Sequence, residues 1–250
     1  MEELDFETDQ GLGSTAKIGL VVLQSDQTIE HDFTRIFDPD PNIVLYKVRI
    51  PNSMEVSEET LQKMEEELPT TVSLLPTSFD FDVIGYACTS GATVIGEQRV
   101  DSIIKSIHPG VKTTNPITAV KASLSALNLK RIALVTPYAP EVTMQMQYNL
   151  KEDGYTTNAV ATFNESDDFT VGRIAPKSIL EAAVRIGASH KVDGVFISCT
   201  NLRTLDVIEK AEIALNKPVI SSNQALAWHL SKLAGLTEKK PSLGKLFWSA

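Results

Sequence analysis

Cysteine, aromatic residues and long apolar runs are all scarce in this sequence. Only two of its 250 residues are cysteines, Cys88 and Cys199, and aromatic residues make up 6%. No apolar run approaches the roughly 20 residues of a membrane-spanning helix, and the first residues lack the charged-then-apolar pattern of a secretory signal. We therefore predict a cytoplasmic protein without a membrane partner, whose two thiols stay reduced instead of forming a disulfide.

Several common kinds of binding site also find no support. The four histidines, His31, His108, His190 and His229, lie outside any metal-ligand spacing, so no metal site is expected. No glycine-rich turn follows a strand in the pattern that binds dinucleotides, which indicates chemistry without a cofactor. The net charge is -9 and no cluster of basic residues stands out, so a nucleic-acid partner is not expected.

What the sequence does contain, from Lys17 onward, is an alternation of short apolar runs and helical patterns. The runs are rich in Val, Ile and Leu, which is typical of parallel strands buried on both faces. They lie at 17–24, 42–50, 82–89, 131–138, 156–163, 193–200 and 217–222. A period of about 3.6 residues predicts helices over 57–75, 94–107, 116–127, 140–152, 176–187 and 202–215.

Two of the predicted strands resemble each other. Residues 81–89 (FDVIGYACT) and 192–200 (VDGVFISCT) share an aspartate, an apolar strand, a small residue and a final Cys-Thr. The repeat predicts an α/β protein with two similar flavodoxin-like halves, each a mainly parallel sheet with helices on both faces. We expect a flexible N-terminal arm (1–16), a first half (17–115 plus 220–250) and a second half (116–219), with the active site in the cleft between the halves.

The paired Cys-Thr motifs are the strongest candidates for chemistry. Ligands of parallel sheets bind beyond the carboxyl ends of the strands, where the N–H groups of the next helix stabilise an anion or a thiolate. A single cysteine there is ordinarily a small buried apolar residue. Two cysteines on facing halves, however, place one thiol on each side of a substrate, an arrangement that suits proton removal and return, or thiolate attack with a partner acid.

At these residues the sequence resembles the aspartate/glutamate racemase superfamily, in the branch of maleate isomerases, arylmalonate decarboxylases and ectoine-utilisation proteins. The resemblance rests on GYACTSGA (85–92), TPY (136–138), SCTNLRTLD (198–206) and PVISSNQALAW (218–228). The segments LAG (233–235) and LGKLF (243–247) look most like the decarboxylase and ectoine-utilisation members.

The resemblance implies roles for individual residues. Cys88 falls on the first cysteine of isomerases and racemases, where decarboxylases have glycine, and Cys199 falls on the second, which serves as acid or base. The hydroxyl groups expected to hold a small carboxylate substrate belong to Thr89, Ser90, Tyr138 and Thr200. The resemblance leaves a homo-oligomer open as the assembly.

Two positions depart from the maleate isomerase pattern. The first loop reads Gln24-Ser25-Asp26-Gln27-Thr28 instead of a Ser-Ser-Asn-Thr type, and Asp168 takes the place of an asparagine in Pro-Asp-Asn. Two carboxylates would repel a dicarboxylate but suit a substrate that carries an ammonium or amidinium group as well. Either aspartate is alternatively a helix N-cap.

The favoured function is therefore inversion of the carbon next to the carboxylate in a small amino-acid-like or ectoine-like substrate, by proton transfer between the two thiols. The alternatives are maleate cis-trans isomerisation through a covalent adduct of Cys88, arylmalonate-type decarboxylation, and ligand binding without turnover, because a fold alone does not fix an activity.

Overall fold

The computed structural model describes residues 1–9, 11–37, 42–237 and 239–248. Its strands form two parallel sheets of four, in the orders β2-β1-β3-β4 and β6-β5-β7-β8. The strands are β1 (Ala16–Leu23), β2 (Ile43–Ile50), β3 (Val83–Ala87), β4 (Lys112–Thr114), β5 (Arg131–Thr136), β6 (Thr156–Thr162), β7 (Gly194–Ile197) and β8 (Val219–Ser221). The two orders are equivalent, which confirms an α/β fold with two similar halves.

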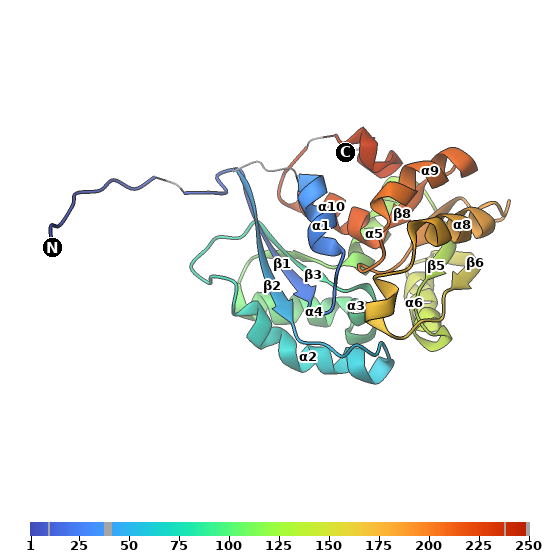
Figure 1. The fold of residues 1–250 in the computed structure, drawn as a ribbon, viewed down its shortest axis with the longest axis horizontal. Helices are drawn as coiled ribbons and strands as arrows, with labels where there is room; N and C mark the ends of the chain where they lie inside the picture. The colour runs from blue at the N-terminus through green and yellow to red at the C-terminus, as the bar shows by residue number, and fades with distance from the viewer. Residues whose placement is uncertain (10, 38–41, 238, 249–250) are drawn as a thin grey trace.

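The helices follow the strands in sequence and pack around them (Figure 1). They are α1 (Ile29–Phe37), α2 (Glu58–Val72), α3 (Thr89–Ile95), α4 (Glu97–Ile107), α5 (Pro116–Ala126), α6 (Pro140–Glu152), α7 (Asp168–Val171), α8 (Pro176–Gly187), α9 (Leu205–Leu215) and α10 (Ser222–Leu233). Two short 3-10 turns, Pro241–Leu243 and Lys245–Trp248, end the described chain. Within the described ranges, no helix is long and apolar enough to cross a membrane.

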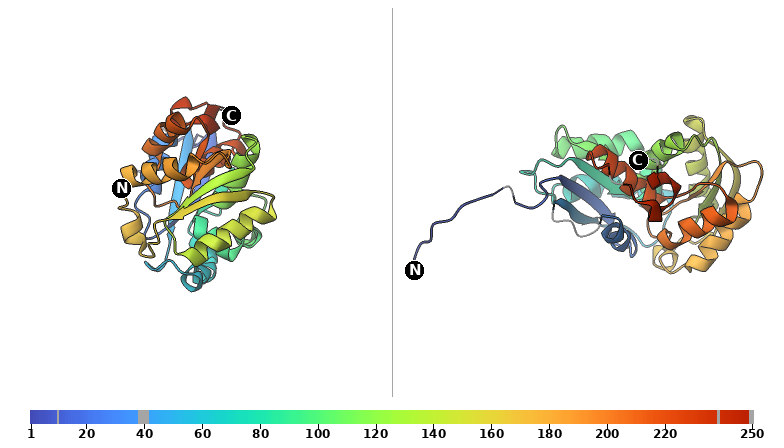
Figure 2. Two further views of the ribbon diagram at one scale, coloured as in Figure 1. Left: turned by 90° about the vertical axis from the view of Figure 1, so that its right-hand side faces the viewer. Right: turned by 90° about the horizontal axis from the view of Figure 1, so that it is seen from above.

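Burial explains why the strands take these places in the sheets. The central strands β3 and β7 are buried at every residue, as expected for strands covered on both faces. The edge strand β6 alternates exposed and half-buried residues along its whole length. In the right-hand view of Figure 2, the blue-to-green elements of the first sheet lie beside the yellow-to-orange elements of the second.

Helices α5 and α10 join the two halves. They pack against each other, and α10 also contacts β3 and β4 of the first sheet and β8 of the second. The boundary expected between residues 219 and 220 falls inside β8, and the division into halves stays a prediction. Residues 1–9, which belong to the expected N-terminal arm, extend away from the rest of the molecule (Figure 1).

One difference between the predicted and the observed helices bears on Cys88. The helix expected over 94–107 begins at Thr89 and is interrupted at Gly96, whose φ of 95° ends α3 and starts α4. Only glycine adopts such a φ without strain. The short α3 that results begins directly after Cys88, so the thiol lies at a helix start.

Candidate functional site

Cys88 lies at the junction between β3 and α3. It is the N-cap of α3, and its Sγ accepts a hydrogen bond of 3.2 Å from the Gly91 N–H. The side chain is buried, in contact with the hydroxyl of Ser90 at 3.7 Å. A helix start places free N–H groups around the sulfur, which is where an anion or a thiolate is stabilised.

Cys199 occupies the equivalent end of β7 in the second half. It is buried and has a φ of 113°, a value that residues other than glycine rarely adopt. Its Sγ accepts a hydrogen bond of 3.4 Å from the Asn201 N–H. Both cysteines are free thiols, so the paired strand ends carry no disulfide.

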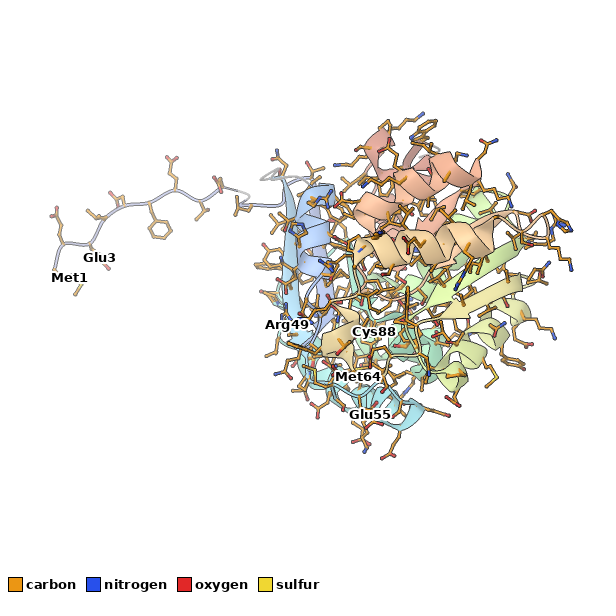
Figure 3. The ribbon with its side chains drawn as sticks, turned by 45° about the vertical axis from the view of Figure 1, so that its right-hand side comes forward. Met1, Glu3, Arg49, Glu55, Met64 and Cys88 are labelled. Atoms are coloured by element: carbon orange, nitrogen blue, oxygen red, sulfur yellow. The ribbon has the colours of Figure 1, made fainter. Side chains whose placement is uncertain are left out.

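One pocket contains both cysteines, and it draws residues from both halves. The predicted residues that line it are Cys88, Thr89, Ser90, Tyr138, Asp168, Cys199 and Thr200. The remaining lining comes from the first half: Leu23, Asn52, Ser53, Glu55, Val56, Thr60, Leu61 and Met64. Figure 3 labels Cys88 with Met64 and Glu55 near it. The pocket therefore combines thiols and hydroxyl groups at the strand ends with both polar and apolar side chains of the β2–α2 region.

The residues between β2 and α2 were not among the residues predicted for the site. Asn52, Ser53, Glu55 and Val56 follow the end of β2, which lies at the same edge of the sheet as the end of β3. The signal was their position, because ligands of parallel sheets bind at that edge. The segment carries no thiol or histidine, so its residue types alone do not predict a site there.

The two predicted aspartates take different roles. Asp26 is outside the pocket lining, and its Oδ1 accepts hydrogen bonds of 2.8 Å from the N–H groups of Thr28 and Ile29 at the start of α1. This is the geometry of a helix cap. Asp26 Oδ2 is buried with no hydrogen-bond partner in the described structure, and burial raises the pKa of this carboxyl to about 6.

Asp168, in contrast, lines the pocket. The cap of α7 is its neighbour Asp167, which accepts a hydrogen bond of 3.0 Å from the Thr170 N–H. Asp168 Oδ2 accepts a hydrogen bond from the hydroxyl of Ser25, which in turn accepts one of 2.8 Å from Asn52 Nδ2. Burial raises the pKa of Asp168. Ser25 and Asn52 thus hold a second-half carboxyl group from the first half.

Burial favours the protonated form of both thiols. Burial raises the pKa of Cys88 to about 11, against the opposing hydrogen bond from the Gly91 N–H. Burial also raises the pKa of Cys199, and the charge of Asp168 adds to that increase. The phenol of Tyr138 is buried beside them, and burial raises its pKa as well. A ligand that neutralises Asp168 would consequently favour a thiolate at Cys199.

Two connecting segments that contribute to the pocket lining pair with each other. Residues 54–56 pair with residues 166–168 in a short antiparallel bridge centred on Glu55 and Asp167. The Val56 N–H donates to Ser166 O and the Asp168 N–H to Met54 O, both at 2.8 Å. The open space in the pocket is about 20 Å³, roughly enough for one water molecule. No group of His, Cys, Asp and Glu among the described residues is arranged to hold a metal ion.

Comparisons with known proteins agree with this fold and pocket. The family model of arylmalonate decarboxylases matches residues 55–247. The arylmalonate decarboxylase of Bordetella bronchiseptica is 28% identical over 243 residues, covering 94% of this chain and 97% of the relative. A maleate isomerase of Nocardia farcinica is 27% identical over 240 residues, covering 92% and 94%.

A solved structure extends the likeness to three dimensions. A variant of the Nocardia farcinica maleate cis-trans isomerase with a covalently bound succinylcysteine intermediate is 26% identical, covers 93% of this chain and 98% of its own, and superposes with a TM-score of 0.85. A closer likeness to ectoine-utilisation proteins stays a prediction. The family model matches most of the chain, and one pocket between the two halves contains both cysteines. This chain therefore belongs to the arylmalonate decarboxylase family, in the aspartate/glutamate racemase superfamily.

Proposed function

We propose that this protein is a cofactor-independent isomerase that inverts the carbon next to a carboxylate, in a small amino-acid-like or ectoine-like substrate with a cationic group. One observation carries the proposal: Cys88 and Cys199 reach the same pocket from the two halves, and Asp168 lines it too. Among the described lining residues there is no lysine or arginine to bind a second carboxylate.

The reaction needs one thiolate and one thiol. The substrate carboxylate accepts hydrogen bonds from hydroxyl groups at the strand ends, and one cysteine thiolate takes the proton from the neighbouring carbon. The negative charge moves onto the carboxylate oxygens, where the same hydroxyl groups stabilise it. The opposite thiol then returns its own proton to the other face of the carbon. The reaction thus ends with thiol and thiolate exchanged.

Charge in the pocket supports a cationic substrate. Burial is the main reason that the pKa of Cys199 is raised, and the charge of Asp168 raises it further. An ammonium or amidinium group paired with Asp168 removes that repulsion and favours the thiolate that the reaction requires. A second carboxylate in the same place would lie against Asp168 in a buried site, where like charges repel strongly.

The second candidate is cis-trans isomerisation of maleate, in which Cys88 adds to the double bond, the bond rotates, and elimination follows. It is favoured by the succinylcysteine intermediate in the structurally similar Nocardia isomerase. Decarboxylation, as in the Bordetella relative, is disfavoured by Cys88, because the resemblance gives decarboxylases glycine at that position.

Proton exchange distinguishes these reactions. We expect the purified protein in D₂O to remove the signal of the α-proton from one zwitterionic or amidinium compound in a panel followed by proton NMR. The panel contains maleate, aspartate, glutamate, ectoine, hydroxyectoine and the N-acetyl-diaminobutyrates. Conversion of maleate to fumarate without deuterium uptake would establish the second candidate instead. If no compound in the panel exchanges a proton or is converted, a protein that binds its ligand without turnover is favoured.

The two cysteines give the matched variants. Cys88→Ser and Cys199→Ser should each lower turnover by at least about a hundredfold, since removing a positioned proton-transfer group costs roughly 10²–10⁴. The folded state should lose less than about 2 kcal/mol, because serine is of similar size and only a polar group is newly buried. Near-normal turnover in either variant would sink the two-thiol mechanism.

Asp168 tests the charge argument. Asp168→Asn keeps the shape and the hydrogen bond from Ser25 but removes the charge. We expect kcat/KM for the cationic substrate to fall by about tenfold or more while dicarboxylates begin to bind, since a buried charge pair and its repulsive counterpart are each worth more than about 1.4 kcal/mol. Asp167→Asn, which keeps the cap of α7, is the control. If D168N still prefers the cationic substrate over dicarboxylates as the wild type does, Asp168 does not determine selectivity for substrate charge.

A further inference from the structure

Ser222 connects the two cysteine loops. It is the first residue of α10, directly after β8, and it is fully buried. Its Oγ accepts a hydrogen bond of 2.8 Å from the Thr89 hydroxyl, next to Cys88, and one of 3.0 Å from the backbone N–H of Cys199. One donor comes from each half, so a single oxygen atom fixes the distance between the two strand ends.

The second of these bonds restrains an unfavourable backbone conformation. Cys199 has a φ of 113°, and such conformations persist only where the surroundings hold them in place. The restraints are its N–H bond to Ser222 and the bond from the Asn201 N–H to its Sγ. Asn201 is itself fixed by a bond of 2.8 Å from its Nδ2 to the backbone carbonyl of Asp168. Removing the Ser222 acceptor therefore releases one of the two direct restraints.

The first bond also bears on the substrate. The Thr89 hydroxyl donates its hydrogen bond to Ser222 Oγ. For Thr89 to donate to a substrate carboxylate, this bond has to reverse, and the Ser222 hydroxyl then donates its own proton to Thr89 Oγ1. Ser222 can do so because the Cys199 N–H needs only one of its lone pairs. Ser222 lies outside the pocket lining, so it acts through Thr89 and Cys199.

We propose that Ser222 is a positioning residue that sets the two cysteine loops relative to each other and supports the Thr89 hydroxyl during substrate binding. Its catalytic consequence rests on the proposed two-cysteine function, whereas the structural coupling does not. Ser221 offers a matched control: it is the adjacent residue, also fully buried, and its Oγ accepts a bond of 3.2 Å from the Gln224 N–H as the cap of α10. In the part of the chain that the structure describes, its hydroxyl caps α10 and makes no hydrogen bond to either cysteine loop.

Cysteine labelling makes the coupling visible without a substrate. The chain has two cysteines, so a protein labelled with ¹⁵N-cysteine gives two amide signals. Ser222→Ala should shift both signals and speed hydrogen exchange of the Cys199 amide by about tenfold or more, because a buried N–H loses its acceptor. Exchange is compared with that of β5 by mass spectrometry, which reports opening of the whole fold. In S221A, hydrogen exchange of the Cys199 amide should speed up by no more than the exchange of β5 does.

A second variant guards against loss of the fold in S222A. Thr89→Val removes the donor of the first half only, and we expect it to shift the Cys199 amide signal in the second half. The same substitution should have no further effect on that signal in the S222A background, provided that variant folds. If T89V leaves the Cys199 signal in place, or if S222A and S221A give equal exchange relative to β5, Ser222 does not couple the loops.

Turnover separates this proposal from the proposed function. On a verified substrate S222A should lower kcat by about a hundredfold, as expected for groups displaced by about 1 Å, with KM within about threefold. Ser222→Thr, which keeps the hydroxyl, should recover most of that loss, and S221A should change kcat little. Shifted cysteine signals together with active C88S and C199S variants would retain the coupling and overturn the two-thiol function. Unshifted cysteine signals together with inactive C88S and C199S variants would overturn the coupling by Ser222 and retain the two-thiol function.

Discussion

Behind the pocket, two carboxyl groups are buried close to one another. Asp32 on α1 is 3% exposed, and its Oδ2 accepts a hydrogen bond of 2.9 Å from Asn223 Nδ2. Burial is the main reason that the pKa of Asp32 rises to about 7, and the charge of Asp26 adds to it. Asn223 also donates to the backbone carbonyl of Thr200 at 2.8 Å. The protonation of Asp32 is thereby one hydrogen-bonded residue away from the Cys199–Thr200 loop.

The raised pKa of Asp32 predicts how stability changes with pH. The unfolded chain releases this proton near pH 4 and the folded protein only near pH 7, so the unfolded state binds fewer protons in between. The stabilisation is complete below about pH 4 and is lost as the pH rises to 7. Relative to Asp32→Asn, the wild type should lose about 2 kcal/mol between pH 5 and pH 7, at about 1.4 kcal/mol per unit.

Urea unfolding of both proteins at pH 5 and pH 7 measures this difference. Asp193→Asn is a suitable control, because Arg131 lowers the pKa of Asp193 and its contribution changes only below about pH 4. A wild type and D32N that differ by the same free energy at both pH values would mean that Asp32 ionises normally in the folded protein.

Residue chemistry could be predicted from the sequence where a motif repeats. Cys88 and Cys199 were recognisable because the same Cys-Thr follows two similar strands. The roles of Asp26 and Asp168 were not, since a cap and a pocket carboxylate differ only in which neighbouring N–H groups point at the side chain. The structure makes Asp26 the cap and leaves that role at α7 to Asp167. Ser222 gave no signal, because its importance lies in contacts with residues far away in sequence.

At the scale of elements, sequence patterns predicted most of the strands and helices but missed the helices α1, α7 and α10. The strands with nearly continuous apolar residues were predicted, as were α6 and α8, whose bounds match. The prediction did not include α10, because residues 222–228 are all buried and show no polar face to set a period. The three-residue β4 is too short to carry a pattern. The helix that positions Ser222 was therefore among those hidden from the sequence.

The end of β2 shows the same limit. Its connection to α2 supplies part of the pocket lining and one side of the bridge between the two segments. Sequence patterns locate such a connection but do not give its path, which depends on the partner segment 166–168 from the other half. Pairing between segments so distant in the chain is a property of the assembled fold.

At the scale of the whole molecule, the two halves are held closed over the pocket. The bridge between 54–56 and 166–168 adds two backbone hydrogen bonds to the Ser25–Asp168 contact. The open space of about 20 Å³ is smaller than an amino-acid-sized substrate, so we predict that the bridge opens when a substrate enters. Both thiols are also buried, which strengthens the electrostatic interactions among the groups that line the pocket.

A disulfide across the bridge tests this requirement. Glu55 and Asp167 form a non-hydrogen-bonded antiparallel pair, because the two backbone hydrogen bonds lie on either side of it. The Cα atoms of such a pair lie about 4.5 Å apart. A disulfide can span this distance. The double variant Glu55→Cys/Asp167→Cys should lose at least about 90% of its turnover on oxidation, because a substrate cannot enter a locked pocket. Turnover should return with a reductant. The turnover of each single variant should be the same with and without the oxidant, each compared with its own reduced form, since Cys88 and Cys199 are buried. Full turnover by the oxidised double variant, with the disulfide verified by mass spectrometry, would show that substrates enter by another route.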